Sequence, residues 1–133
     1  MADEIIYVTD THSLIWYLTA SPRLSEPARQ AFAQIAQGNA KLIVPLIVIA
    51  ELVYVVEKSR VQVDIDGVIQ RLSGNPAIEI APMTLDIALA MRTTTSVPEM
   101  HDRMIVCEAK ARRAKLITCD QEIQRAQLVE TIW

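Results

Sequence analysis

Residues Leu42 to Val56 read Leu-Ile-Val-Pro-Leu-Ile-Val-Ile-Ala-Glu-Leu-Val-Tyr-Val-Val, and this stretch decides how the chain folds. Glu51 is its only charged residue. We expect so apolar a segment to pack inside the protein, because exposure would forfeit the main driving force of folding. A carboxylate there is costly unless a buried cation, a metal ion or hydrogen-bond donors compensate it. The group that Glu51 faces is therefore the first question that the sequence raises.

The stretch itself is predicted to divide into a strand and a helix. Residues 41–44 are short and β-branched, which is typical of a buried strand. The β-branched content of the remainder also favours a strand, but residues 46–58 contain no turn signal and are longer than most strands. Pro45 suits the first turn of a helix. We therefore predict a buried helix over 46–58.

Outward from this stretch, strands and helices are predicted to alternate along the chain. Strands are predicted at 5–9, 77–81, 115–118 and 129–133. Helices are predicted at 14–18, 26–36, 64–72, 84–93, 102–114 and from 121. Such alternation implies parallel pairing and right-handed crossovers. The expected fold is a three-layer α/β/α sandwich with a mostly parallel central sheet of four to five strands, formed by residues 1–133 as one domain.

Composition narrows the class of protein. The net charge is −3, so a protein that coats nucleic acid through its overall charge is excluded. The two cysteines are too few for a disulfide scaffold, and no run is long enough to span a membrane. With no signal-peptide pattern either, a cytoplasmic protein is expected. One basic cluster stands out, for which a solvated helix face and a nucleic-acid contact are both open: Arg103, Lys110, Arg112, Arg113 and Lys115.

Four acidic residues lie where function gathers in such a fold, beyond the carboxyl ends of parallel strands. Asp10 and Asp120 follow predicted strands, Asp102 opens a predicted helix, and Glu51 can reach the same end of the sheet. Each aspartate can alternatively be a helix N-cap, and Glu51 can be held by a buried arginine. Carboxylates that do converge repel one another unless a cation holds them, and oxygen ligands suit Mg²⁺ or Mn²⁺. Such a site commonly serves phosphoryl chemistry.

Four segments carry a resemblance to a known family: Val8-Thr9-Asp10-Thr11-His12, Ile49-Ala50-Glu51-Leu52, His101-Asp102-Arg103-Met104-Ile105 and Ile117-Thr118-Cys119-Asp120. They resemble the acidic motifs of PIN-domain nucleases, most closely the short VapC-type toxins of prokaryotic toxin–antitoxin pairs. The resemblance covers almost the whole chain, in the same order. It implies a metal-dependent endoribonuclease that cleaves with a metal-activated water and leaves a 5′-phosphate and a 3′-hydroxyl.

The same resemblance implies roles for individual residues. Asp10 and Asp102 would be central Mg²⁺ ligands, Glu51 would complete the cluster, and Asp120 would be the fourth acid. The hydroxyls of Thr11 and Thr118 would fix carboxylates or contact phosphate, although both can simply cap helices.

Family members tend to be homodimers, which a small antitoxin blocks by placing a segment over the acidic pocket. Operator DNA is commonly bound through that antitoxin.

Other residues carry weaker expectations. Arg103 and Arg112 are candidates for contact with RNA phosphates, against ion pairing or solvation. His12 and His101 lack the His/Cys spacing of a zinc site. Trp16, Tyr17 and Tyr54 are expected in the core or at a dimer interface rather than stacked on nucleobases. For Trp133 the sequence does not decide whether it packs at an interface.

Two other functions remain as alternatives: a non-catalytic binding module of this fold, and an aspartate-nucleophile phosphatase. The phosphatase is disfavoured because its usual second aspartate is replaced by His12.

Overall fold

The computed structural model describes residues 4–58 and 61–133. Its strands are β1 (Ile6–Thr9), β2 (Lys41–Pro45), β3 (Ile78–Ala81), β4 (Lys115–Ile117) and β5 (Thr131–Ile132). Its helices are α1 (Thr11–Leu18), α2 (Glu26–Ala36), α3 (Leu46–Glu57), α4 (Ile65–Ser73), α5 (Leu85–Ala90), the 3₁₀ turn η1 (Met91–Thr93), α6 (Met100–Arg112) and α7 (Gln121–Ala126).

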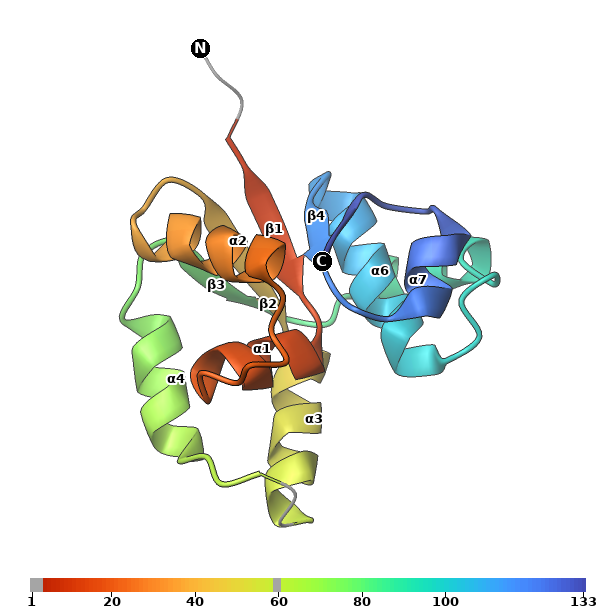
Figure 1. Ribbon diagram of the computed structural model, residues 1–133. Helices are drawn as coiled ribbons and strands as arrows, with labels where there is room; N and C mark the ends of the chain where they lie inside the picture. Colours follow the sequence, from red (N-terminus) through yellow and green to blue (C-terminus); the bar gives the residue numbers. More distant parts are fainter. Residues whose placement is uncertain (1–3, 59–60) are drawn as a thin grey trace.

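The five strands form one parallel sheet in the order β3-β2-β1-β4-β5. The chain leaves β1 toward β2 and β3, then returns to the other side of β1 to add β4 and β5. Right-handed crossovers place α1, α2 and α4 on one side of the sheet and α5 and α6 on the other. Helix α3 continues past the carboxyl end of β2 and contacts both α1 and α6 (Figure 1). The predicted α/β fold with a parallel central sheet is confirmed. The point between β1 and β4, where the strand order reverses, is where open α/β sheets place their ligands.

The central strands are buried on both faces. Val8, Val44 and Leu116 on neighbouring strands are fully inaccessible to solvent, and Phe32 from α2 and Ile105 from α6 are almost completely covered as well. Apolar side chains cover such strands from both sides, which explains why their sequences run apolar without alternating.

The prediction of a buried helix after Pro45 is wrong in part. Residues 46–57 do form α3, but Val48 and Leu52 are its only buried residues. Leu46 is 47% exposed and Tyr54 is 59% exposed. Four more of its apolar residues are partly buried and pack against the core, namely Ile47, Ile49, Val55 and Val56. Hydrophobic content alone therefore overestimated its burial, because no other described element covers its outer side.

Helix starts follow the expected capping chemistry at most positions. Asp10, Ser25, Thr84 and Asp120 each accept a backbone N–H of the first helical turn. The prediction that α6 begins at Asp102 is wrong. The cap is Glu99, whose Oε2 accepts the N–H of Asp102 at 2.7 Å, so α6 begins earlier and Asp102 lies inside its first turn. Asp64 precedes α4 but makes no side-chain capping bond.

In the parts of the chain that the structure describes, no helix is long and apolar enough to cross a membrane.

Candidate active site

The four acids singled out in the sequence meet in one pocket. Its volume is about 270 Å³, and it lies beyond the carboxyl ends of β1 and β4. It is lined by Asp10, Thr11, His12, Glu51, Glu99, Asp102, Ile105, Cys119 and Asp120. The helices α1, α3, α6 and α7 and the short link after β4 deliver these residues, so the pocket draws on segments more than 100 residues apart. The convergence expected from the topology is therefore observed.

Asp10 is the most firmly held of the acids. Its Oδ1 accepts the backbone N–H of Ser13 at 2.9 Å, and its Oδ2 accepts the hydroxyl of Thr118 at 2.5 Å. Its own N–H donates to the carbonyl of Ile117, so the residue is fastened to β4 as well as β1. Burial raises the pKa of Asp10 above its usual range, although the hydrogen bonds from Ser13 and Thr118 oppose the rise. The carboxylate is thus fixed in position at an electrostatic cost.

Thr118 connects two of the acids. Besides donating to Asp10, its hydroxyl oxygen accepts the backbone N–H of Asp120 at 3.0 Å. Asp120 in turn caps α7 by accepting the N–H of Ile123 at 3.0 Å. Thr118 has no exposed surface. Its hydroxyl is therefore committed to holding carboxylates, and the expectation that Thr118 also contacts substrate phosphate is not supported by its position.

Glu51 faces the pocket. The hydroxyl of Thr11 donates to its Oε1 at 2.7 Å, and the Nδ1 atom of His101 lies 3.7 Å from its Oε2. Within the described ranges no arginine pairs with Glu51, so the alternative of a buried Arg–Glu ion pair fails. The single charge in the apolar stretch has instead been placed at the pocket wall, where Thr11 orients it.

Asp102 is the acid most affected by its neighbours. Its pKa is raised from 3.8 to about 7, chiefly because of burial and then because of the negative charges of Asp120, Glu99, Asp10 and Glu51. No hydrogen bond to its carboxylate is present in the described part of the molecule that would offset this cost. A group in this position gains most from a nearby cation.

Glu99 was missed in the sequence, where it falls in a predicted loop. It is a fifth carboxylate in the pocket, it caps α6, and its Oε1 lies 3.1 Å from the Nδ1 of His101. Glutamate is not among the residues usually found at an N-cap, so no capping signal marked Glu99 in the sequence.

The donor chemistry of the pocket fits a hard divalent cation. Five carboxylates supply only oxygen ligands, which Mg²⁺ and Mn²⁺ prefer, and no neighbouring lysine or arginine neutralises them in the described pocket lining. Across residues 4–58 and 61–133, however, no three His, Cys, Asp or Glu side chains stand arranged to hold a metal ion. The residues are thus of the type that such an ion prefers, and ligation would require some of the carboxylates to approach one another more closely than they do here.

The two arginines expected to contact substrate are engaged elsewhere. Nε of Arg103 donates to the carbonyl of Val97, which fastens the loop before α6. Arg112 makes two hydrogen bonds to Glu79 of β3, at 3.2 and 2.6 Å, and lies ten residues beyond Asp102 on α6, about 15 Å along the axis. The structure therefore does not bring Arg112 to the pocket, because a neighbouring acid on the sheet holds it.

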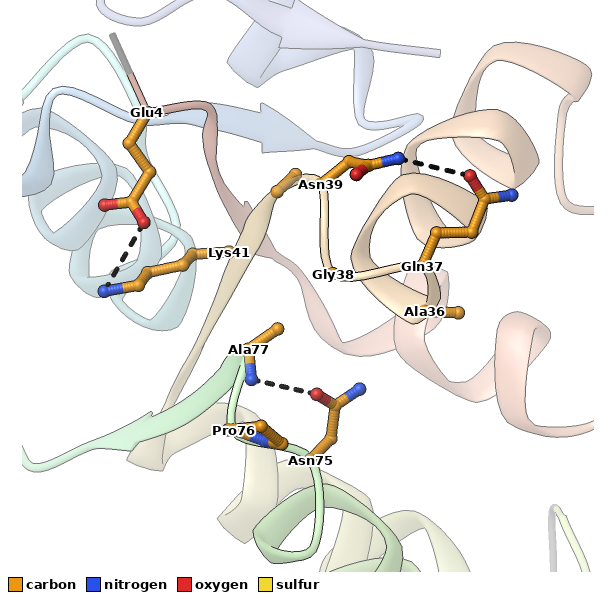
Figure 2. A pocket seen from close by; sticks show the side chains of 10 residues that line it. Glu4, Ala36, Gln37, Gly38, Asn39, Lys41, Asn75, Pro76 and Ala77 are labelled. Atoms are coloured by element: carbon orange, nitrogen blue, oxygen red, sulfur yellow. Dashed lines mark hydrogen bonds and ion pairs between the residues drawn. The ribbon is translucent and has the colours of Figure 1, made fainter. Parts of the chain in front are cut away.

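A second hollow, of about 490 Å³, lies at the opposite pole, by the amino ends of β2 and β3. Figure 2 shows that its polar groups largely satisfy one another: Glu4 pairs with Lys41, and Asn75 accepts the N–H of Ala77. It gathers no cluster of like charges, so the acidic pocket is the candidate active site.

Comparison with known proteins identifies the family. The family model described as PIN domain matches residues 7–128. The chain belongs to the PIN-domain family, as its motifs suggested.

Solved structures with the same fold come from toxin–antitoxin complexes. VapBC2 from Rickettsia felis, bound to a DNA fragment from its promoter, matches with a TM-score of 0.73 and 19% identity over 96% of this chain and 97% of that chain. A toxin–antitoxin complex from Klebsiella pneumoniae gives a TM-score of 0.67 and 20% identity, covering 92% and 94% of the two chains. DNA-bound VapBC from Salmonella typhimurium gives 0.67 and 17%, covering 96% of each. No curated protein sequence matches the chain.

The raised pKa of Asp102 predicts a pH-dependent stability in chelator-treated protein. Between about pH 4 and 7 the folded state binds more protons at Asp102 than the unfolded state, so the free energy of unfolding falls as pH rises through this window. Asp102→Asn removes the charge, so the variant should melt a few degrees higher than wild type near pH 8 and lose this advantage toward pH 4. Melting temperatures in EDTA test this. The exposed Asp86→Asn serves as control and should bring no gain at the higher pH.

Proposed function

We propose that this protein is a metal-dependent endoribonuclease and the toxin of a toxin–antitoxin pair. The observation that carries the proposal is the convergence of Asp10, Glu51, Asp102 and Asp120 in one pocket, at the strand-order reversal of a PIN-domain chain. Clustered carboxylates without basic neighbours suit a divalent cation, and hydrolysis of phosphodiesters is the chemistry that such sites commonly serve. Its proposed place of action is the cytoplasm.

The residues would divide the work as follows. Asp10 and Asp102 would bind Mg²⁺ or Mn²⁺, and Asp120 would complete the acidic wall. Glu51 would orient the attacking water, with Thr11 holding its carboxylate. The bound ion would supply a more acidic water and neutralise charge on the phosphate oxygens. Attack by water would leave a 5′-phosphate and a 3′-hydroxyl.

A phosphatase that uses Asp10 as nucleophile fits the geometry poorly. Both oxygens of Asp10 already accept hydrogen bonds, and the side chain is buried. Burial limits the access of a phosphoryl group to Asp10, and the usual second aspartate of such phosphatases is replaced by His12. The non-catalytic binding module remains as the outcome if cleavage is not found.

Cleavage of labelled RNA tests the proposal. Wild-type protein should cut RNA with Mg²⁺ or Mn²⁺ and stop when the metal is chelated. Asp10→Asn and Asp102→Asn should each lower the rate about 100-fold or more, because they remove a ligand charge while keeping a side chain of the same shape. Asparagine also caps helices, so Asp10→Asn should still fold.

Glu26→Gln, an exposed acid on α2, is the matched control and should cleave normally. Cleavage that persists in chelator and in both aspartate variants would contradict the proposal.

A small antitoxin is the partner proposed for the pocket. The structural neighbours are toxin–antitoxin complexes, two of them bound to DNA, and the surplus of negative charge suits an inserted arginine or lysine. Operator DNA would then be bound through the antitoxin, since the chain itself carries a net charge of −3.

The product of an adjacent reading frame, mixed with this protein at equal molar ratio, should therefore stop RNA cleavage. The inhibition should weaken as salt is raised, because ion pairs hold the inserted segment. Undiminished cleavage at an excess of that product would count against the pairing.

We also propose a homodimer formed through an apolar face. This face comprises exposed side chains on α3, around α5 and at the start of α6, namely Leu46, Tyr54, Met83, Leu85, Leu89 and Met100. Leu46 and Met83 line one small hollow, and α3 and α5 each pack against α6, which supports treating these residues as one face. A second copy is the favoured occupant because an apolar surface of this kind is complementary to itself across a two-fold axis.

Leu85→Glu should shift the protein from dimer to monomer in sedimentation velocity. Leu85 is 72% exposed in the first turn of α5, where glutamate is acceptable to the helix, so folding should be unaffected. Ile5→Glu places the same charge on an exposed apolar residue outside the apolar face and should remain dimeric. Wild-type protein that sediments as a monomer at high concentration would rule the dimer out.

A further inference from the structure

Three aromatic rings form a row that begins at the acidic pocket. His12, which lines the pocket, lies with its ring centroid 5.7 Å from that of Trp16, with 46° between the ring planes. Trp16 lies 5.7 Å from Trp133, with 54° between the planes. We call His12, Trp16 and Trp133 the aromatic row. None of the rings takes part in the chemistry assigned to the carboxylates.

Two residues of the aromatic row lie on α1, which also lines the pocket, and the third lies beside the strand that leads to it. His12 and Trp16 are one helical turn apart on α1, so they share a face of the helix that Asp10 caps. Trp133 follows β5, which pairs with β4, the strand that leads to Asp120. The position of the row relative to the acids is therefore set by the fold, and a ligand at the pocket lies within reach of the first ring.

The rings are not enclosed as core aromatics are. His12 is exposed, and Trp16 and Trp133 are only partly buried. The next aromatic residue on α1 shows the contrast, because Tyr17 stacks on Phe32 at 4.3 Å with the planes 5° apart, and Phe32 is almost completely covered. Trp16, Tyr17 and Trp133 are all partly buried against the core, so the difference lies in their ring partners. Tyr17 stacks on the buried Phe32, whereas the aromatic row begins at His12 in the wall of the pocket.

The negative charge of the pocket disfavours binding of RNA through its phosphates, and the aromatic row offers another way to bind it. Five carboxylates repel a polyanion, and the two arginines expected to hold phosphates are bonded to Val97 and Glu79 instead. Stacking of bases on aromatic rings requires no cation and tolerates any sequence, and single-stranded RNA offers unstacked bases for it. We propose that His12, Trp16 and Trp133 form a stacking surface for nucleobases next to the scissile phosphate. This inference rests on the proposed RNA substrate.

Intrinsic fluorescence tests the proposal directly, since Trp16 and Trp133 are the only tryptophans in the chain. The protein carries Asp102→Asn to prevent hydrolysis, and the probes are a short oligoadenylate and an abasic strand of equal length. The oligoadenylate should quench tryptophan emission and bind more tightly than the abasic strand, which has the phosphates but no bases to stack. Trp133→Leu should weaken oligoadenylate binding about 5- to 150-fold, the loss expected for one stacked base, whereas Trp133→Phe should largely restore it.

Tyr17→Leu is the matched control, because it removes an aromatic ring from α1 that stacks on Phe32 and faces Arg71 and does not belong to the aromatic row. It should lower stability without changing the affinity difference between the two probes. In protein with Asp102 intact, Trp133→Leu should raise KM for RNA and leave kcat near the wild-type value, as for a contact made equally in the ground and transition states. A Trp133 that only packs the end of the chain would affect melting and leave both binding and KM unchanged.

The outcomes separate this inference from the proposed function. Equal binding and equal quenching by the two probes would overturn the stacking surface even if RNA is cleaved. Base-dependent quenching with no cleavage would support the stacking surface and overturn the nuclease.

Discussion

Repulsion among carboxylates is the constraint on which this structure depends. Five acids share one pocket, and burial together with the charges of the other four raises the pKa of Asp102 to about 7. The scaffold opposes this with fixed donors: Thr118 and Ser13 hold Asp10, and Thr11 holds Glu51. These hydrogen bonds hold like charges together at a cost in stability, which the cation of the proposed function would offset.

The topology makes this concentration of charge possible. Because β1 lies between β2 and β4 in a parallel sheet, segments from both halves of the chain end at the same edge. The apolar sequence of β2 and the inner stripe of α3 fix the wall from which Glu51 projects. The hydrophobic core and the acidic pocket are therefore products of the same strand order, and neither can be rearranged without the other.

Sequence patterns predicted the parallel α/β fold and the meeting of the four acids, because strand–helix alternation and strand ends determine both. They failed where contacts between distant segments determine the partner or the exposure of a side chain. Glu99 was hidden in a loop until its capping bond to Asp102 was visible, and the exposure of Leu46 and Tyr54 depends on which neighbours α3 has. Arg112 was misjudged because Glu79, its partner, is distant in sequence. Local composition carries no information on such pairings.

The pairing of Thr9 with Ile117 and the bond from Thr118 to Asp10 join residues at nearly opposite ends of the chain. Contacts of such long range form late in folding, since a large loop must close first. During translation, the residues of β1, β2 and β3 are synthesised before those of β4. The pocket is therefore incomplete throughout most of translation, and whatever chemistry it performs is withheld from the ribosome and message that are producing it.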